Sequence, residues 1–208
     1  GEGVKPVSAA IQPRGGVQGA TSTKMYQCLN SALSFLLTFS DGEVSDFASR
    51  ATFTSSDPTV VQVSNADIPV PGSTTGQVYS RGVLIPGNVG TANITATYLS
   101  FTQTITVNVG TIENLRISPT AAYLAPATLQ TLSLIADLDG LPTVLNNSAT
   151  WQITMPNTAI ATIDSATGIV TGVAAGSGLV AQAQFASCGQ TASANIEVSP
   201  LQSLAVYR

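Results

Sequence analysis

Apolar and polar residues alternate along several segments of this chain, and the alternation limits the possible folds more than any other feature. Residues 32–39, 102–109 and 192–198 place apolar side chains at alternating positions. A period of two residues is typical of half-buried β-strands. Turn-forming pairs such as Asp41-Gly42 and Asp139-Gly140 separate the strand-like segments, and no segment carries a convincing helical stripe. The sequence therefore predicts an all-β protein with antiparallel strands, arranged as a sandwich or a barrel.

Four segments of the first half recur, in the same order, in the second half. The matching pairs are 7–13 with 113–119, 51–53 with 149–151, 57–63 with 157–163, and 90–95 with 176–181. Repetition at this spacing predicts two tandem copies, one domain over residues 1–110 and another over 111–200. Residues 201–208 resemble the start of a copy, so we interpret them as a further repeat or a C-terminal extension of a longer chain.

The absence of histidine removes several kinds of chemistry at once. Ser-His-Asp and Cys-His catalysis need an imidazole, and so do His-ligated zinc and iron sites. No glycine-rich loop precedes a helix, so nucleotide binding is not supported. We therefore predict a protein that is not an enzyme, with no catalytic, cofactor-binding or metal-binding residues assigned and no cofactor.

Carboxylates are the remaining candidates for chemistry. Asp41, Glu43 and Asp46 lie in one predicted loop, and Asp137 and Asp139 lie in the equivalent loop of the second copy. Paired carboxylates can bind calcium or hydrolyse glycosides. Acidic residues beside glycine are more often solvated hairpin turns, because Asp-Gly adopts the positive φ angles that such turns need. We interpret both loops as turns, with calcium binding left open.

Charge and hydropathy argue against two classes of partner. Seven basic and eleven acidic residues give a net charge of -4, so the basic surface that nucleic acid requires is missing. Residues 165–196 contain no charged side chain, but repeated glycine and glutamine interrupt them. A membrane span needs about 20 mainly apolar residues. We predict no nucleic-acid partner and no membrane-spanning segment in this chain.

The second copy contains Ala149-Thr150-Trp151, residues 157–164 and residues 167–176, and this pattern resembles the group 2 bacterial Ig-like domain. The first copy is similar over the same span, with Phe53 in place of the usual Trp and an insertion around Ile68–Gly72. Such domains occur in tandem in intimin- and invasin-type surface proteins. The resemblance implies two Ig-like antiparallel β-sandwiches arranged end to end.

The same resemblance implies a function and a cellular location. We expect a non-enzymatic extracellular module, a spacer or adhesive segment of a bacterial cell-surface protein or lipoprotein, located at the cell surface or in the periplasm. Its partner would be an unidentified protein or glycan at the surface. Two alternatives stay open: accessory carbohydrate-binding or linker domains of an extracellular carbohydrate-active enzyme, and a phage virion decoration domain. The fold does not decide among them.

The alternation also predicts which side chains fill each core. For the first copy we expect Leu33, Phe35, Leu37, Phe53, Val61, Val63, Ile94 and Val107. For the second copy we expect Leu132, Leu134, Trp151, Ala161, Ile163, Val180, Ile196 and Val198.

Each copy contains one of the two cysteines, so neither domain can form an internal disulfide. Cys28 precedes the predicted strand 32–39 and lies in the loop between the first two strands. Cys188 lies in a tight turn between the last two strands. In the usual Ig strand order these loops lie at the ends where the chain leaves the first domain and enters the second. We therefore predict an inter-domain Cys28–Cys188 disulfide, which an oxidising compartment permits.

Overall fold

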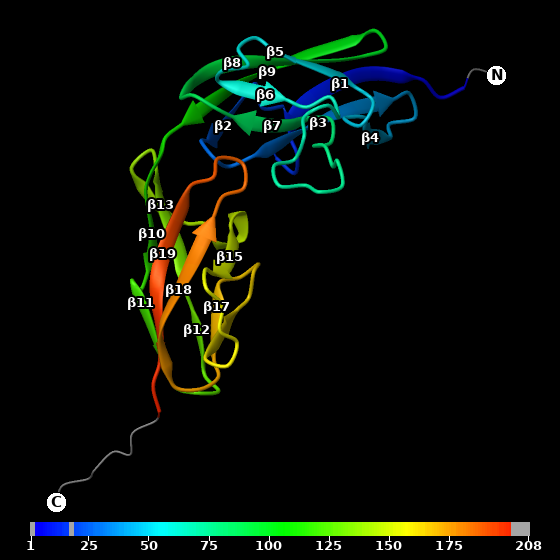
Figure 1. Ribbon diagram of the computed structural model, residues 1–208. Helices are drawn as coiled ribbons and strands as arrows, with labels where there is room; N and C mark the ends of the chain where they lie inside the picture. Colours follow the sequence, from blue (N-terminus) through cyan, green and yellow to red (C-terminus); the bar gives the residue numbers. More distant parts are fainter. Residues whose placement is uncertain (1–2, 17–18, 201–208) are drawn as a thin grey trace, which may run out of the picture. The chain divides into compact units, whose positions relative to one another are not determined.

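A computed structural model describes residues 3–16 and 19–200 of the chain (Figure 1). Contacts divide the chain between Thr111 and Ile112 into two compact units. In the described ranges the only helical element is a single 3₁₀ turn, η1 (Asn146–Ser148), and no helix is long and apolar enough to cross a membrane. The further repeat predicted at 201–208 lies outside the described residues. The prediction of an all-β protein is confirmed.

Two sheets form the first unit. One contains β1 (Pro6–Pro13), β3 (Ser31–Phe39), β7 (Val83–Pro86) and β6 (Val61–Val63) in that order, with β4 (Val44–Asp46) paired to β3. The other contains β2 (Ser22–Tyr26), β9 (Phe101–Gly110), β8 (Gly90–Tyr98) and β5 (Thr52–Ser55). Side chains from both sheets belong to one buried cluster. The two sheets therefore face each other as a β-sandwich.

The second unit repeats this plan with one sheet divided. β11 (Ala121–Leu124), β19 (Thr191–Val198), β18 (Gly176–Gln184) and β15 (Thr150–Ile153) form a four-stranded sheet. Opposite it lie two short sheets, β10 (Ile112–Ser118) with β13 (Ser133–Leu138) and β14 (Leu141–Val144), and β12 (Leu129–Thr131) with β17 (Ile169–Gly172) and β16 (Ala161–Ile163). The division falls at Leu132, whose N–H donates to the carbonyl of Gly168 instead of a strand partner.

The predicted core of the first unit is confirmed, with one qualification. Seven of its members are buried: Leu33, Phe35, Leu37, Phe53, Val61, Ile94 and Val107. Val63 is only partly buried, because it lies at the end of the edge strand β6 and packs against the margin of the cluster.

In the second unit six of the eight predicted core residues are buried, including Trp151, which is 1% exposed. Ile163 is half-buried, as its counterpart Val63 is. The prediction that Val180 is a core residue is wrong, because Leu179 and Ala181 are the buried residues of β18. The register of β18 against β19 shifts between Gly176 and Leu179, and Gly178 has a φ of 83°. This bulge displaces the inward positions by one residue, since alternation has a period of two.

Candidate functional site

In each unit the last strand pairs in parallel with a strand near the unit's beginning. Residues 22–26 of β2 pair in parallel with residues 106–110 of β9, and residues 121–124 of β11 pair in parallel with residues 195–198 of β19. At the two ends of the first pairing, the N–H of Thr106 donates to Thr21 at 3.1 Å and the N–H of Gln27 donates to Gly110 at 3.1 Å. The second strand and the last strand of each unit are thus joined by a parallel hydrogen-bond ladder.

The outward face of the β8–β9 hairpin carries only threonine and asparagine from residue 91 to 97 and from 102 to 108. Four directly opposed pairs of side chains are hydrogen-bonded across it. The pairs and their oxygen–oxygen distances are Thr91–Asn108 at 2.8 Å, Asn93–Thr106 at 2.9 Å, Thr95–Thr104 at 2.9 Å and Thr97–Thr102 at 3.3 Å. We call these eight residues the ladder face. It presents an uncharged row of hydroxyl and amide groups, and cross-strand pairs of this kind also stabilise the sheet.

The corresponding face of the second unit is polar but less regular. Its outward residues include Gln152 and Gln182, which share a hydrogen bond at 3.0 Å, and Asn195 on β19. Val180 and the exposed Tyr123 interrupt the polar surface. The uniform ladder is therefore a property of the first unit.

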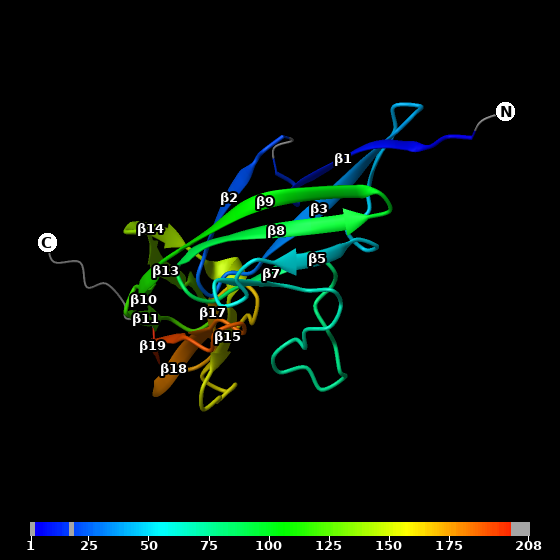
Figure 2. The same ribbon diagram turned by 90° about the horizontal axis from the view of Figure 1, so that it is seen from above.

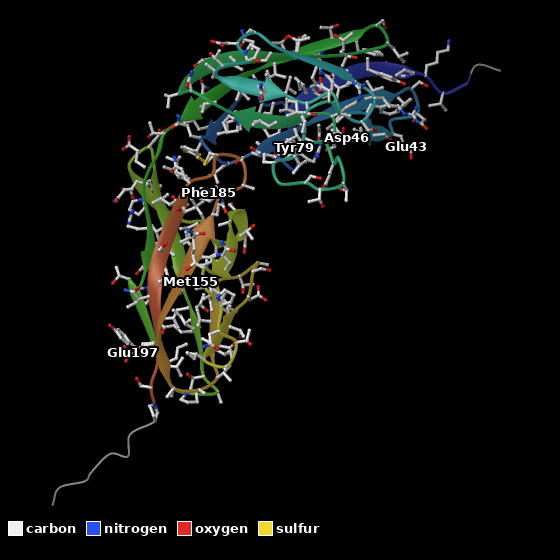
Figure 3. All side chains as sticks on the ribbon, viewed as in Figure 1. Glu43, Asp46, Tyr79, Met155, Phe185 and Glu197 are labelled. Atoms are coloured by element: carbon white, nitrogen blue, oxygen red, sulfur yellow. The ribbon has the colours of Figure 1, made fainter. Side chains whose placement is uncertain are left out.

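The loop carrying Asp41, Glu43 and Asp46 forms the predicted hairpin turn, which connects β3 to β4. The carboxylate of Asp41 accepts the N–H of Glu43 at 3.0 Å, and Gly42 has a φ of 88°. Asp46 lies beyond the turn, where its Oδ1 accepts the backbone N–H groups of Phe35 at 3.1 Å and Ala48 at 2.9 Å. Figure 3 shows Glu43 and Asp46 at the β4 margin of the unit. The carboxylates of Asp41 and Asp46 therefore act as hydrogen-bond acceptors for backbone N–H groups.

In the second unit a neutral residue, Asn146, has the hydrogen-bonding role of Asp46. There Asn146 Oδ1 accepts the N–H of Leu134 at 2.7 Å, in the position that corresponds to Phe35. An amide suffices for this role, so the role of Asp46 does not depend on its charge.

Asp137 and Asp139 are not a cluster. Asp137 lies within β13 and forms an ion pair with Arg116 across the β10–β13 ladder at 3.1 Å, while Asp139 and Gly140 form the β13–β14 turn with φ angles of 47° and 83°. In the part of the chain that the structure describes, no three acidic or cysteine side chains are grouped as metal ligands would be.

Two exposed aspartates have lowered pKa values because they stabilise turns. The hydroxyl of Thr59 donates to Asp57 at 2.6 Å, and this bond is the main reason that the pKa of Asp57 is below its usual range. The backbone N–H of Ala166 donates to Asp164 at 2.9 Å and is the main cause of the lowered pKa of that carboxyl. Hydrogen bonds to a carboxylate favour its charged form.

Both cysteines are disulfide-bonded, and neither is a free thiol. Cys28 lies in the turn between β2 and β3 with a φ of 67°; the sequence alone did not reveal β2, so this is one strand later than predicted. Cys188 lies in the predicted turn between β18 and β19, closed by hydrogen bonds between Phe185 and residues 189–190. The pairing of Cys28 with Cys188 stays a prediction.

Among the residues that the structure describes, neither unit places several exposed tyrosine rings together as a flat platform of the kind that sugar-binding surfaces use. Tyr98 is half-buried and stacks on Phe47 with ring centroids 5.3 Å apart. Tyr123 is 73% exposed and comes from the other unit. Tyr79 is half-buried in the loop after β6, where its carbonyl accepts the Ser64 hydroxyl at 2.7 Å.

Sequence reasoning missed the parallel strand pairs and the ladder face. The pairs could not be found from periodicity, because parallel and antiparallel edge strands alternate in the same way. The ladder face did leave a signal, since every second residue over 91–97 and 102–108 is Thr or Asn.

Known proteins resemble this chain in part. No protein-family model matches it. It is 32% identical over 177 residues to Ice-binding protein 1 of Shewanella frigidimarina; the aligned region covers 81% of this chain but 18% of that protein. Among solved structures, domains 5–6 of the S-layer protein SbsC share 14% identity over 95% of this chain and all of that one, with a TM-score of 0.38. A C-terminal intimin fragment in complex with its receptor's binding domain shares 16% identity over 94% of this chain and 64% of that one, with a TM-score of 0.32.

Proposed function

We propose that this chain is a non-enzymatic spacer or adhesive segment of a bacterial extracellular protein, built from Ig-like domains of group 2. The disulfide-bonded cysteines support an oxidising compartment, outside the cell or in the periplasm. The carboxylates of Asp41 and Asp46, the candidates for acid–base chemistry, accept backbone hydrogen bonds instead. Its partner would be a protein or glycan at the cell surface.

The observation that carries the proposal is the parallel pairing of β2 with β9 and of β11 with β19. Tension on a unit enters through its first strand, β1 or β10, reaches the second strand, β2 or β11, and leaves at the end of the last strand, β9 or β19. Because the paired strands run in the same direction, such tension pulls them in opposite directions along their common axis. The hydrogen bonds of the ladder then bear the load together. This arrangement suits a segment that transmits force between a surface and a partner.

Single-molecule stretching of the chain between handle domains, with the cysteines reduced, tests this role. The bonds of Thr21 and Gln27 to β9 show that alternate residues of β2 take part in the ladder, so Thr23→Pro removes a donor from it. Ser45→Pro is the matched control, because it removes one ladder bond from the edge strand β4. We expect Thr23→Pro to lower the unfolding force of the first unit much more than Ser45→Pro does. Equal losses of force would contradict a load-bearing role.

The ladder face favours a second candidate function, contact with ice. The aligned relative is named for ice binding, although the aligned region is 18% of its length. Neighbouring strands lie about 4.8 Å apart, and alternate residues of one strand lie about 6.7 Å apart. The threonines and asparagines of the ladder therefore form a repeating array of uncharged hydrogen-bonding groups, which suits a repeating surface of water molecules.

Inhibition of ice recrystallisation by the chain tests this second candidate. Thr95→Tyr places a bulky ring in the middle of the ladder face, and Thr131→Tyr places one on an exposed strand of the other unit. We expect the first change to abolish inhibition and the second to leave it intact. A chain without inhibitory activity, or one equally active after both changes, would rule out ice contact through this face.

A further inference from the structure

One edge of β3 has no strand partner over residues 33–35 in the described part of the chain. Along this edge β3 pairs with β7 at residues 31–32 and with β4 at residues 36–38. In between, two side chains bond to the backbone of β3. Asp46 Oδ1 accepts the N–H of Phe35 at 3.1 Å, and Arg14 Nη2 donates to the carbonyl of Leu33 at 3.0 Å. A carboxylate and a guanidinium therefore lie at the same break between β4 and β7.

The second unit fills the corresponding break with one neutral side chain. Asn146 Oδ1 accepts the N–H of Leu134 at 2.7 Å, and its Nδ2 donates to the carbonyl of Leu132 at 2.7 Å. A carboxylate accepts hydrogen bonds but does not donate them, so the first unit needs both Asp46 and Arg14 for the bonds that one amide makes. Because a neutral amide satisfies the same backbone groups, the fold does not require charges at this place.

A second guanidinium comes from the opposite side of the break. Ser80 and Arg81 lie near the end of the β6–β7 loop, residues 64–82, which projects from the first unit in Figure 2. Arg81 is half-buried, and its Nη1 donates to the carbonyl of Ala51 at 2.8 Å. A pocket of about 290 Å³ lies between these groups, lined by Arg14, Asp46, Ala48, Ser49, Ser80 and Arg81. With two guanidinium groups and one carboxylate, the lining has an excess of positive charge.

Both guanidinium groups are held in place and keep donors for a ligand. The bonds to Leu33 and Ala51 use one terminal nitrogen of Arg14 and one of Arg81, whereas a guanidinium has five N–H donors. Its planar fork matches the geometry of a carboxylate. Groups that are already fixed by backbone carbonyls lose little freedom when a ligand binds. The pocket is therefore suited to an organic carboxylate.

The remaining polar groups of the lining favour hydroxyls on the same ligand. The carboxylate of Asp46 repels a second negative charge but accepts hydrogen bonds from hydroxyls, and the exposed Ser49 and Ser80 both donate and accept. An acidic peptide side chain brings a carboxylate without hydroxyls, whereas an acidic sugar brings both. The volume is at the small end of the range for ligand sites, about 300–1,000 Å³, which suits a single sugar residue.

We propose that this pocket binds a uronic acid residue of an acidic glycan. The sugar carboxylate pairs with Arg14 and Arg81, and the sugar hydroxyls bond to Asp46, Ser49 and Ser80. The site narrows the partner of the proposed adhesive segment to an acidic glycan, and its biological setting rests on that proposed function. The pocket belongs to the sheet that faces β2 and β9, so ligand binding and load bearing can be tested separately.

An NMR titration of the isotope-labelled chain with sodium glucuronate tests the proposal. We expect saturable shifts of the Ala48 and Ser49 amides, with half-saturation at about 1–10 mM. Glucose lacks the carboxylate and acetate lacks the sugar ring, so each should bind at least about tenfold more weakly than glucuronate. The proposal is wrong if glucuronate gives no saturable shift, or if acetate or glucose binds as well as glucuronate does.

Substitutions that keep a backbone donor but remove a charge identify the groups involved. Arg14→Gln and Arg81→Gln should each weaken glucuronate binding at least about tenfold. Arg50→Gln is the matched control, because its guanidinium lies over the Phe47 ring at 5.7 Å and does not line the pocket. It should change the affinity by less than about twofold in buffered salt. Equal losses in all three variants would show attraction by net charge alone and would overturn the proposal.

Asp46→Asn separates a sugar from a bare anion. The change should weaken glucuronate binding, because a sugar hydroxyl loses its charged acceptor. Stronger binding would show that the pocket accepts an anion without its hydroxyls, and the sugar assignment would then be wrong. These outcomes are distinct from those of the stretching experiment: a chain that bears load but does not bind glucuronate would refute the pocket and leave the load-bearing role standing.

Discussion

The packing of Gly168 against Trp151 gives a prediction whose size can be worked from the structure. Gly168 has a φ of 74°, and a Cβ added there would lie 2.7 Å from Cε2 of the indole. Gly168→Ala should therefore lower the free energy of unfolding for two separate reasons. The left-handed backbone costs about 1–2 kcal/mol for a residue with a side chain. Overpacking against a ring that is 1% exposed adds about 1–3 kcal/mol.

Two comparisons separate these contributions. Gly140 has a φ of 83° and open space around an added Cβ. Gly140→Ala should therefore lower the free energy of unfolding by about 1–2 kcal/mol, from the backbone alone. Trp151→Phe places in the second unit the ring that the first unit has at Phe53. In the first unit a Cβ added at the corresponding Gly82 would lie 3.2 Å from Cζ of Phe53, so the overpacking on that background is smaller. Gly168→Ala should therefore cost less there than on the Trp151 background.

Urea unfolding followed by far-UV circular dichroism measures the free energy of unfolding of the unchanged chain and of four variants, Gly168→Ala, Gly140→Ala, Trp151→Phe and the double variant. The transition of the first unit is the internal reference. The packing argument is refuted if Gly168→Ala is equally destabilising on the Trp151 and Trp151→Phe backgrounds. It also fails if Gly168→Ala costs no more than Gly140→Ala.

Three shorter predictions concern bonds described above. Non-reducing peptide mapping should yield one cross-linked peptide pair, Cys28 with Cys188 within a single chain; a disulfide between two chains would contradict it. The pKa of Asp57 is lowered on folding, so its contribution to stability is present above the unfolded pKa and is lost as the pH falls through the folded pKa. Thr59→Val should therefore raise the pKa of Asp57 in an NMR titration and reduce the loss of stability in acid. Asp46→Ala should destabilise the first unit by about 1–3 kcal/mol in thermal unfolding, whereas Asp46→Asn should retain most of the stability, because it keeps an acceptor for the backbone N–H groups.

Local pattern alone predicted much of the fold. The alternation around Phe35 and Val107 identified strands and their buried faces, because the two faces of a strand differ in solvent exposure and the period is fixed by backbone geometry. The Asp-Gly pairs identified the hairpins at residues 41–42 and 139–140, since the positive φ angles of these turns are a property of the residues themselves. Trp151 was recognised as a core residue for the same local reason.

Other features depended on contacts between distant residues. The bulge at Gly178 reversed the expected direction of Val180, because one extra residue changes the phase of every later position in the strand. The parallel partner of β2 could not be inferred, since β9 lies about eighty residues away and alternation carries no information about partner or direction. The same holds for the candidate site. The Thr and Asn residues of the ladder face can be recognised in the sequence, but the register that pairs them across β8 and β9 is a property of the tertiary structure.

The sequence by itself thus determined the strand period, the turns and most of the buried side chains, all of which arise from interactions among neighbouring residues. Only the tertiary structure decided which strands pair in parallel, that the carboxylate of Asp46 accepts backbone hydrogen bonds from Phe35 and Ala48, and how the side chains of the ladder face align across β8 and β9. The physical reason is that backbone hydrogen bonding is nearly the same for every residue type. The choice of partner is therefore made by the packing of the whole domain, and short-range sequence does not encode it.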